Sequence, residues 1–117
     1  MEINNKIDNG EYISPPTMFL DIDGTLVGFP HTPEKLWEWE TRGCKIILTT
    51  GRKEMFRYET ERALKIAGIG FDQLVMSCGC GPRYIINDRK PGTNNGKNDT
   101  AFAINVDRDE GFNNIKV

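Results

Sequence analysis

The chain has 117 residues, of which 38% are hydrophobic and 27% are charged, and its net charge is −2 at pH 7. These values are ordinary for one globular domain, and the length is short for two. The small net charge argues against a broadly basic surface for nucleic acid or anionic membranes, and no apolar run approaches the roughly 20 residues of a membrane-spanning helix. We expect an arm at residues 1–16 and a single domain at residues 17–117.

Three cysteines (Cys44, Cys78 and Cys80) and one histidine (His31) narrow the possible chemistry. An odd cysteine count in a chain that can build its own core argues against a disulfide framework. A zinc site normally needs four ligands in two spaced pairs, and a single histidine disfavours a Ser-His-Asp triad. The N-terminus has no apolar stretch of the signal-peptide kind. We therefore expect reduced cysteines and a cytoplasmic protein.

The predicted elements begin after a polar arm that includes one short strand near Tyr12 and Ile13. Residues 17–22 form an apolar run typical of a buried strand. Thr32 is a good N-cap residue, followed by proline at the first helical position and an acid in the first turn. This pattern predicts a helix that ends near Gly43.

Strands and helices keep alternating along the rest of the chain. In order, we expect a strand, a helix and three further strands at residues 45–50, 53–67, 74–77, 83–87 and 101–106. This alternation predicts an α/β fold, a Rossmann-like three-layer sandwich with a mostly parallel sheet of about five strands covered on both faces. In such sheets, ligands bind beyond the carboxyl ends of the strands.

Polar residues follow three of the predicted strands. Asp21 and Asp23 leave the first strand side by side, because side chains two residues apart in a strand point the same way. Residues 49–52 (Thr-Thr-Gly-Arg) end the second strand, and residues 87–90 (Asn-Asp-Arg-Lys) end the fourth. Carboxylate oxygens favour Mg²⁺. A carboxylate can also act as a nucleophile and form an aspartyl-phosphate.

The run Asp-Ile-Asp-Gly-Thr-Leu at residues 21–26, placed after an apolar strand, resembles the first signature of the haloacid dehalogenase (HAD) superfamily of phosphatases. The resemblance covers roughly residues 17–106. It implies that Asp21 is the nucleophile and a Mg²⁺ ligand. It also implies that Asp23 is the general acid for the leaving oxygen and then the base for water, and that its backbone carbonyl binds Mg²⁺.

The second and third signatures of the family concern phosphate binding. The resemblance implies that the Thr50 hydroxyl holds the phosphoryl group together with Gly51, with Thr49 as the less favoured register. Arg83 takes the place of the basic residue before the fourth strand, and Lys90 is the competing candidate.

The fourth signature is an acidic cluster at the end of the fourth strand. Asp88 would be the further Mg²⁺ ligand there, whereas Asn87 replaces the second acid that is often present. Neither the interval from Asp23 to Thr50 nor the interval from Thr50 to Arg83 has room for a folded cap domain. The resemblance therefore implies a capless type, whose site is open to large substrates or covered by a neighbouring subunit.

The function that we expect is Mg²⁺-dependent hydrolysis of a phosphomonoester through an aspartyl-phosphate, on a sugar phosphate or another small phosphorylated metabolite. Nucleotide or polynucleotide phosphate ends are an alternative to which the acidic balance gives little support. A HAD-like regulatory or binding protein with weakened activity is another, motivated by Asn87. The expected partners are the small substrate and a second copy of the chain that supplies the missing cap, with no membrane and no nucleic acid.

Overall fold

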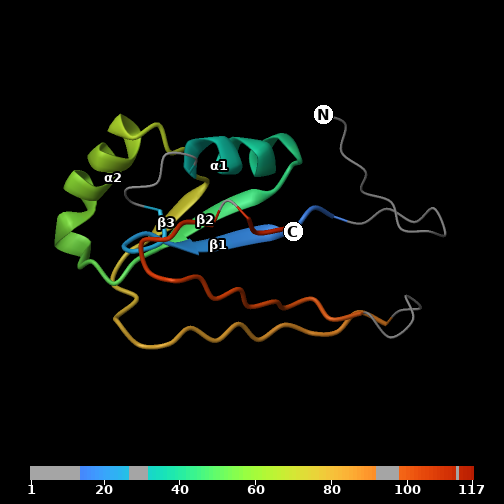
Figure 1. Ribbon diagram of the computed structural model, residues 1–117. Helices are drawn as coiled ribbons and strands as arrows, with labels where there is room; N and C mark the ends of the chain where they lie inside the picture. The colour runs from blue at the N-terminus through green and yellow to red at the C-terminus, as the bar shows by residue number, and fades with distance from the viewer. Residues whose placement is uncertain (1–13, 27–31, 92–97, 113) are drawn as a thin grey trace.

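The computed structural model describes residues 14–26, 32–91, 98–112 and 114–117. The elements are β1 (Thr17–Asp21), α1 (Thr32–Thr41), β2 (Lys45–Thr49), the 3-10 helix η1 (Glu54–Phe56), α2 (Arg57–Ile66) and β3 (Gln73–Val75). The three strands form one parallel sheet in the order β1-β2-β3 (Figure 1). Neither α1 nor α2 has the length and apolar character of a helix that spans a membrane. The short strand expected near Tyr12 and Ile13 lies outside the described residues.

One face of the sheet forms the core. Leu20, Leu48 and Leu74 lie opposite one another in the register of the three strands, and all three are buried. Leu36 and Trp39 of α1 and Leu64 of α2 belong to the same buried cluster, and both helices lie on the same side of the sheet (Figure 1). Because side chains alternate across a strand, this row of leucines fixes which face the helices cover.

Both helices end as the sequence predicts, at glycines with a left-handed backbone. Gly43 has φ +84°, and its N–H donates to the carbonyl of Glu40 at 2.9 Å after α1. Gly68 has φ +77°, and its N–H donates to the carbonyl of Lys65 at 3.1 Å after α2. Glycine adopts this conformation without the steric cost of a Cβ atom.

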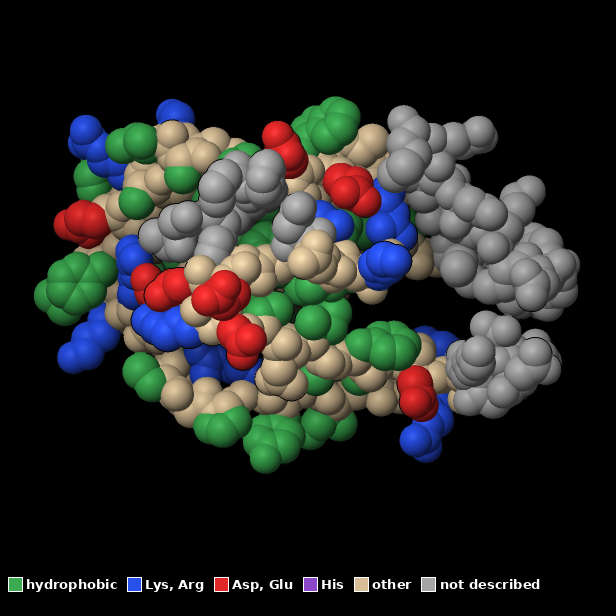
Figure 2. All heavy atoms as spheres, in the orientation of Figure 1, with side chains coloured by type: hydrophobic (Ala, Val, Ile, Leu, Met, Phe, Trp, Pro, Cys, Tyr) green, Lys and Arg blue, Asp and Glu red, His purple; other side chains and the backbone are tan. Residues whose placement is uncertain are grey.

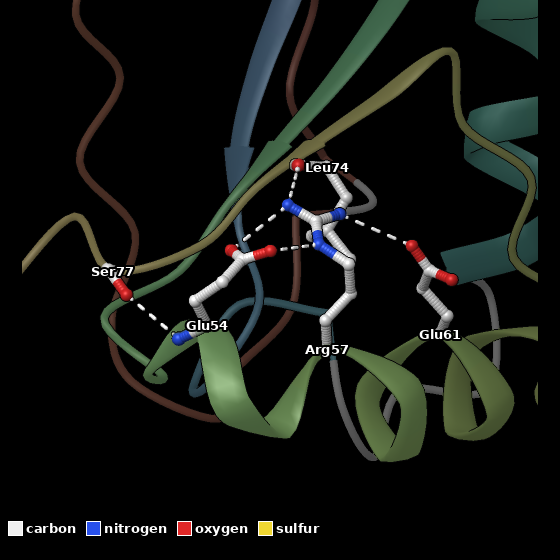
Figure 3. A network of polar contacts seen from close by, with 5 residues as sticks. All are labelled: Glu54, Arg57, Glu61, Leu74 and Ser77. Atoms are coloured by element: carbon white, nitrogen blue, oxygen red, sulfur yellow. Dashed lines mark hydrogen bonds and ion pairs between the residues drawn. The ribbon is translucent and has the colours of Figure 1, made fainter.

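Arg57 fastens the start of α2 to the sheet (Figure 3). Its guanidinium donates to both carboxylate oxygens of Glu54 at 2.6 and 3.2 Å, to Glu61 at 3.2 Å and to the carbonyl of Leu74 in β3 at 3.1 Å. The N–H of Glu54 donates to the Ser77 hydroxyl at 2.9 Å. These bonds hold the segment that follows β2 against the end of β3, which places the turn after β2 at the carboxyl edge of the sheet.

The prediction of a fourth and a fifth strand is wrong. Residues 83–87 and 101–106 are extended but form no strand in the described part of the chain. They belong to two segments that run alongside each other, joined at Lys90 and Asn98 by a backbone N–H to carbonyl bond of 3.2 Å (Figure 1). The fold is therefore a three-stranded α/β layer with helices on one face, and not a five-stranded three-layer sandwich. The apolar run of Tyr84 and Ile86 is almost fully exposed, so burial does not fix its pairing with the sheet.

The C-terminal segment returns to the core after these extended segments. Phe112 is 4% exposed and stacks on Trp39 of α1, with 5.6 Å between the ring centroids. Val106 and Ile115 pack against the same buried cluster. The stacking ties residues that are distant in the sequence to one core, as offset aromatic pairs commonly do.

We expect Phe112→Ala to lower the free energy of unfolding by about 3 kcal/mol, because it removes a buried ring and leaves a cavity beside Trp39. Phe102→Ala is the matched control, since Phe102 is 73% exposed and surface substitutions usually change stability by less than about 0.5 kcal/mol. Urea unfolding of both variants measures the difference. Equal losses in the two variants would show that the stacked pair does not anchor the segment.

Candidate functional site

The acid pair at residues 21 and 23 lies at the carboxyl edge of the sheet. β1 ends at Asp21, which pairs in register with Thr49 at the end of β2. Ile22 is buried between the two acids, so both carboxyl groups are directed away from the core. Gly24 follows with φ +83°, and the chain turns so that the N–H of Leu26 donates to the carbonyl of Ile22 at 2.8 Å. The turn places two carboxylates and the end of β2 next to each other.

Asp23 forms a two-point ion pair with Arg52. The Nε and Nη2 atoms of Arg52 donate to the two carboxylate oxygens of Asp23 at 3.0 and 2.8 Å. Nη1 of Arg52 donates to the Thr60 hydroxyl of α2 at 3.3 Å. These hydrogen bonds from Arg52 lower the pKa of the Asp23 carboxyl below its ordinary value, and they raise the pKa of Arg52. Two parallel hydrogen bonds between a guanidinium and a carboxylate fix the relative orientation of the two side chains and also pair their charges.

Asp21 has the opposite electrostatic setting. Its partial removal from water raises the pKa of its carboxyl above the ordinary value, and the negative charge of Asp23 adds to this effect. A hydrogen bond from the backbone of Ile22 and the positive charges of Arg83 and Arg108 act in the other direction without cancelling it. The two acids of one strand end are thus driven apart in pKa by their surroundings.

The turn after β2 is closely packed. Thr50 has no exposed surface, and its hydroxyl accepts a hydrogen bond of 3.1 Å from the N–H of Arg52. A Cβ atom on Gly51 would lie 2.7 Å from the carbonyl oxygen of Gly79, so only glycine fits there without a shift of the neighbouring loop. The Thr49 hydroxyl donates to the carbonyl of Leu20 at 3.4 Å. The structure brings Thr50 and Gly51 to the edge that carries the acid pair, with the hydroxyl turned inward.

Arg83 lies close enough to Asp21 for its charge to lower the pKa of that carboxyl. Its guanidinium is engaged with the loop after β3, where it donates to the carbonyl of Gly81 and, at 2.9 Å, to that of Gly79. The carbonyl of Gly79 also packs against Gly51. Arg83 therefore supports the turn after β2 indirectly, through the loop that follows β3. Its role as a phosphate-binding residue stays a prediction.

Asp88 and Lys90 pair with each other rather than with the acid pair. Their side chains are 2.9 Å apart, and the ammonium lowers the pKa of the Asp88 carboxyl. They lie on the extended segment that begins near the carboxyl edge of the sheet and runs away from it (Figure 1). Among the described residues, no three histidine, cysteine or acidic side chains come together as metal ligands. The assignment of Asp88 as a metal ligand stays a prediction.

Two arginines near the acid pair received no role in the sequence analysis. Arg52 directly follows Thr50 and Gly51, so its position after the second strand was a usable signal. Arg108 comes from the charged C-terminal segment, and no sequence pattern connected it with the first strand. Its side chain lies over Gly24, where an added Cβ would be 2.9 Å from Nη1 of Arg108. Acidic and basic side chains gather in this part of the surface (Figure 2).

The donor set of this edge fits a hard divalent cation. Asp21 and Asp23 offer carboxylate and backbone carbonyl oxygens at one strand end. Mg²⁺ typically uses one or two carboxylates, several waters and the oxygens of a substrate phosphate, so two acids are enough.

No family model, curated protein or solved structure matches the chain.

We expect Arg52→Gln to raise the pKa of Asp23 toward the ordinary value of about 3.9, because the hydrogen bonds from the guanidinium to the carboxylate are lost. In the wild type, ionised Asp23 contributes stability that is complete above the unfolded-state pKa and is lost as the pH falls through the lower folded-state pKa. The variant should lack this contribution. Carboxyl carbon NMR over a pH series measures the pKa directly.

Arg42→Gln is the matched control, since it removes the same charge near the opposite, amino end of β2. The pKa of Asp23 should be the same in this control and in the wild type. An unchanged pKa of Asp23 in Arg52→Gln would contradict the ion pair described above.

Proposed function

We propose that the protein is a Mg²⁺-dependent phosphomonoester hydrolase that acts through an aspartyl-phosphate at Asp21. One observation carries the proposal: two carboxyl groups leave the carboxyl end of a single strand beside the turn after β2, and the guanidinium of Arg52 from that turn binds one of them. Carboxylates beside cationic side chains at one sheet edge supply the nucleophile and the charge neutralisation that phosphoryl transfer needs. The resemblance of residues 21–26 to the first HAD signature supports Asp21 as the nucleophile and Asp23 as the acid and base.

In this proposal the reaction proceeds in two steps. A carboxylate oxygen of Asp21 attacks the phosphorus atom, the bond to the ester oxygen breaks, and Asp23 gives its proton to the leaving oxygen. Asp23 then takes a proton from a water molecule, whose oxygen attacks the phosphorus of the aspartyl-phosphate. Phosphate leaves and Asp21 is restored as a carboxylate. Splitting a very slow hydrolysis into two displacements is the benefit of a covalent intermediate.

Asp23 must hold a proton for the first step, whereas Arg52 keeps its pKa low. An incoming phosphate dianion changes this balance in two ways. Its negative charge raises the pKa of a neighbouring carboxyl, as Asp23 itself does for Asp21. Its oxygens also compete for the guanidinium of Arg52, because arginine binds phosphate in the same two-point manner as carboxylate. Substrate binding would therefore prepare Asp23 as the acid.

The carboxylate of Asp21 and the backbone carbonyl of Asp23 are the groups that would hold Mg²⁺. When bound, the ion supplies neutralisation of the negative charge on the phosphoryl oxygens. Gly51 lets the turn after β2 pack against the carbonyl of Gly79. The Thr50 hydroxyl accepts from the N–H of Arg52 and keeps its own proton, which it would donate to the phosphoryl group once the turn exposes it. A sugar phosphate or another small phosphorylated metabolite is the substrate class that we propose.

A second candidate is a binding or regulatory protein with weakened turnover. The pairing of Asp88 with Lys90, away from the acid pair, favours it. So does the low pKa of Asp23, which opposes its use as an acid. Binding of phosphate without its release from any ester would distinguish this candidate from the hydrolase.

We expect Asp21→Asn to lower the rate of phosphate release by about 10⁴-fold or more, the loss typical when one member of a nucleophilic catalytic unit is removed. The measurement uses a panel of sugar phosphates and p-nitrophenyl phosphate, with Mg²⁺ and with a chelator in its place. Asp99→Asn is the matched control, since Asp99 is an exposed acid paired with Arg89 on the extended segments.

The control should keep the activity of the wild type, and the chelator should abolish that activity. Undiminished phosphate release by Asp21→Asn, or activity indifferent to Mg²⁺, would exclude the proposed mechanism.

A further inference from the structure

Three arginines influence the pKa values of the acid pair, and the guanidinium groups of two of them donate hydrogen bonds to other groups of the protein. The guanidinium of Arg52 donates to both carboxylate oxygens of Asp23, and that of Arg83 donates to the carbonyls of Gly79 and Gly81. Arg108 differs, because within the described part of the chain no ion pair or hydrogen bond involves its side chain. Its charge nevertheless reaches both acids, since it opposes the rise in the pKa of Asp21 and adds to the lowering of the pKa of Asp23. A guanidinium beside the site thus keeps its donors available.

The position of Arg108 is fixed from two sides. The N–H of its neighbour Asp109 donates to the carbonyl of Gly24 at 2.8 Å. Four residues after Arg108, the stacking of Phe112 on Trp39 anchors the segment in the core. These two contacts belong to different parts of the fold, so the turn at residues 107–110 is held over the loop that carries the acid pair.

Gly24 is the residue that lets Arg108 come this close. A Cβ atom at position 24 would lie 2.9 Å from Nη1, 3.0 Å from Cγ and 3.2 Å from Cζ of Arg108. These distances are below normal van der Waals contact, so the arginine stem and guanidinium lie directly against the glycine backbone. Gly24 therefore allows both the positive φ of the turn and the close approach of Arg108 to the loop that carries Asp21 and Asp23.

We propose that Arg108 binds the phosphoryl group of the substrate at Asp21, an inference that rests on the proposed hydrolase function. A phosphomonoester dianion needs cations to approach two carboxylates. Arginine suits this task because its planar fork matches phosphate oxygens with two donors. Arg108 thereby takes a role that the sequence suggested for Arg83 or Lys90. Arg83 is occupied with loop carbonyls, and Lys90 is paired with Asp88.

The test measures the affinity of the full chain for inorganic phosphate, with Mg²⁺ present, by isothermal titration calorimetry and by phosphorus NMR. We expect Arg108→Gln to weaken phosphate binding about tenfold or more, the usual size of a hydrogen-bonded contact between charged groups. Arg108→Lys should lose less, because it keeps the charge and lacks the fork. Arg42→Gln, which removes an arginine from the other end of β2, should bind phosphate as the wild type does.

Steady-state kinetics on a hydrolysed ester then separate binding from folding. Arg108→Gln should raise KM or lower kcat/KM with partial rescue in Arg108→Lys, while the thermal midpoint stays that of the wild type. If the glutamine variant unfolds, the lysine variant carries the test, since it fills the same space over Gly24. Phosphate affinity equal to that of the wild type in a folded Arg108→Gln variant, or in Arg108→Lys where the glutamine variant unfolds, overturns the proposal.

The outcome is distinguishable from failure of the hydrolase. A wild type that binds phosphate through Arg108 and hydrolyses no ester supports the role of Arg108 and rejects the proposed reaction. A wild type that hydrolyses esters with Asp21 essential, and whose Arg108→Gln variant binds phosphate equally well, keeps the reaction and rejects Arg108. A wild type without measurable phosphate binding rejects Arg108 as well.

Discussion

The parallel register of β1 against β2 is the constraint on which the rest of the molecule depends. Leu20 opposite Leu48 and Asp21 opposite Thr49 follow from the same alignment. The leucines bury one face against the helices, and the residues after Asp21 and Thr49 emerge at one edge. Since side chains alternate along a strand, a shift by one residue would turn the buried leucines to the other face of the sheet and also displace Asp21 from Thr49. The hydrophobic core and the polar edge are therefore specified by one set of backbone hydrogen bonds.

The two acids at this edge differ in their electrostatic environment: Asp23 is paired with Arg52, whereas partial burial has the largest effect on the pKa of Asp21. Arg52 holds Asp23, which stays ionised, while partial burial makes ionisation of Asp21 less favourable. The side chains of Asp23 and Arg52 are both partly exposed, so the pair contributes no more than about 1 kcal/mol to stability. A weak pair of this kind is suited to rearrangement, because a phosphate group can compete for the same guanidinium donors. In the proposed reaction, Asp23 would become free to hold a proton when a phosphate group replaces it on Arg52.

The C-terminal segment couples the stability of the core to the composition of the site. Phe112 and Trp39 hold the segment in the core, and the bond from Asp109 to Gly24 holds it at the loop of the acid pair. Arg108 lies between these two points and faces Gly24. Any change that frees the segment from the core would also remove a cation from the neighbourhood of Asp21 and Asp23. Burial far from the edge therefore helps to set the electrostatic potential at the edge.

Features that depend on residues close together in the chain could be predicted before the fold was known. Short apolar runs predicted the first three strands, a proline and an acid after Thr32 predicted the start of α1, and Gly43 predicted its end. The placement of Asp21, Asp23 and Thr50 at one edge also followed, because parallel strands end together. The remaining features follow from the packing of the folded chain. The apolar runs near Tyr84 and Phe102 form no strand in the described part of the chain, and Arg108 lies over Gly24 in the loop that carries the acid pair. These outcomes rest on contacts between segments far apart in the chain, and no local spacing of residue types encodes such partners.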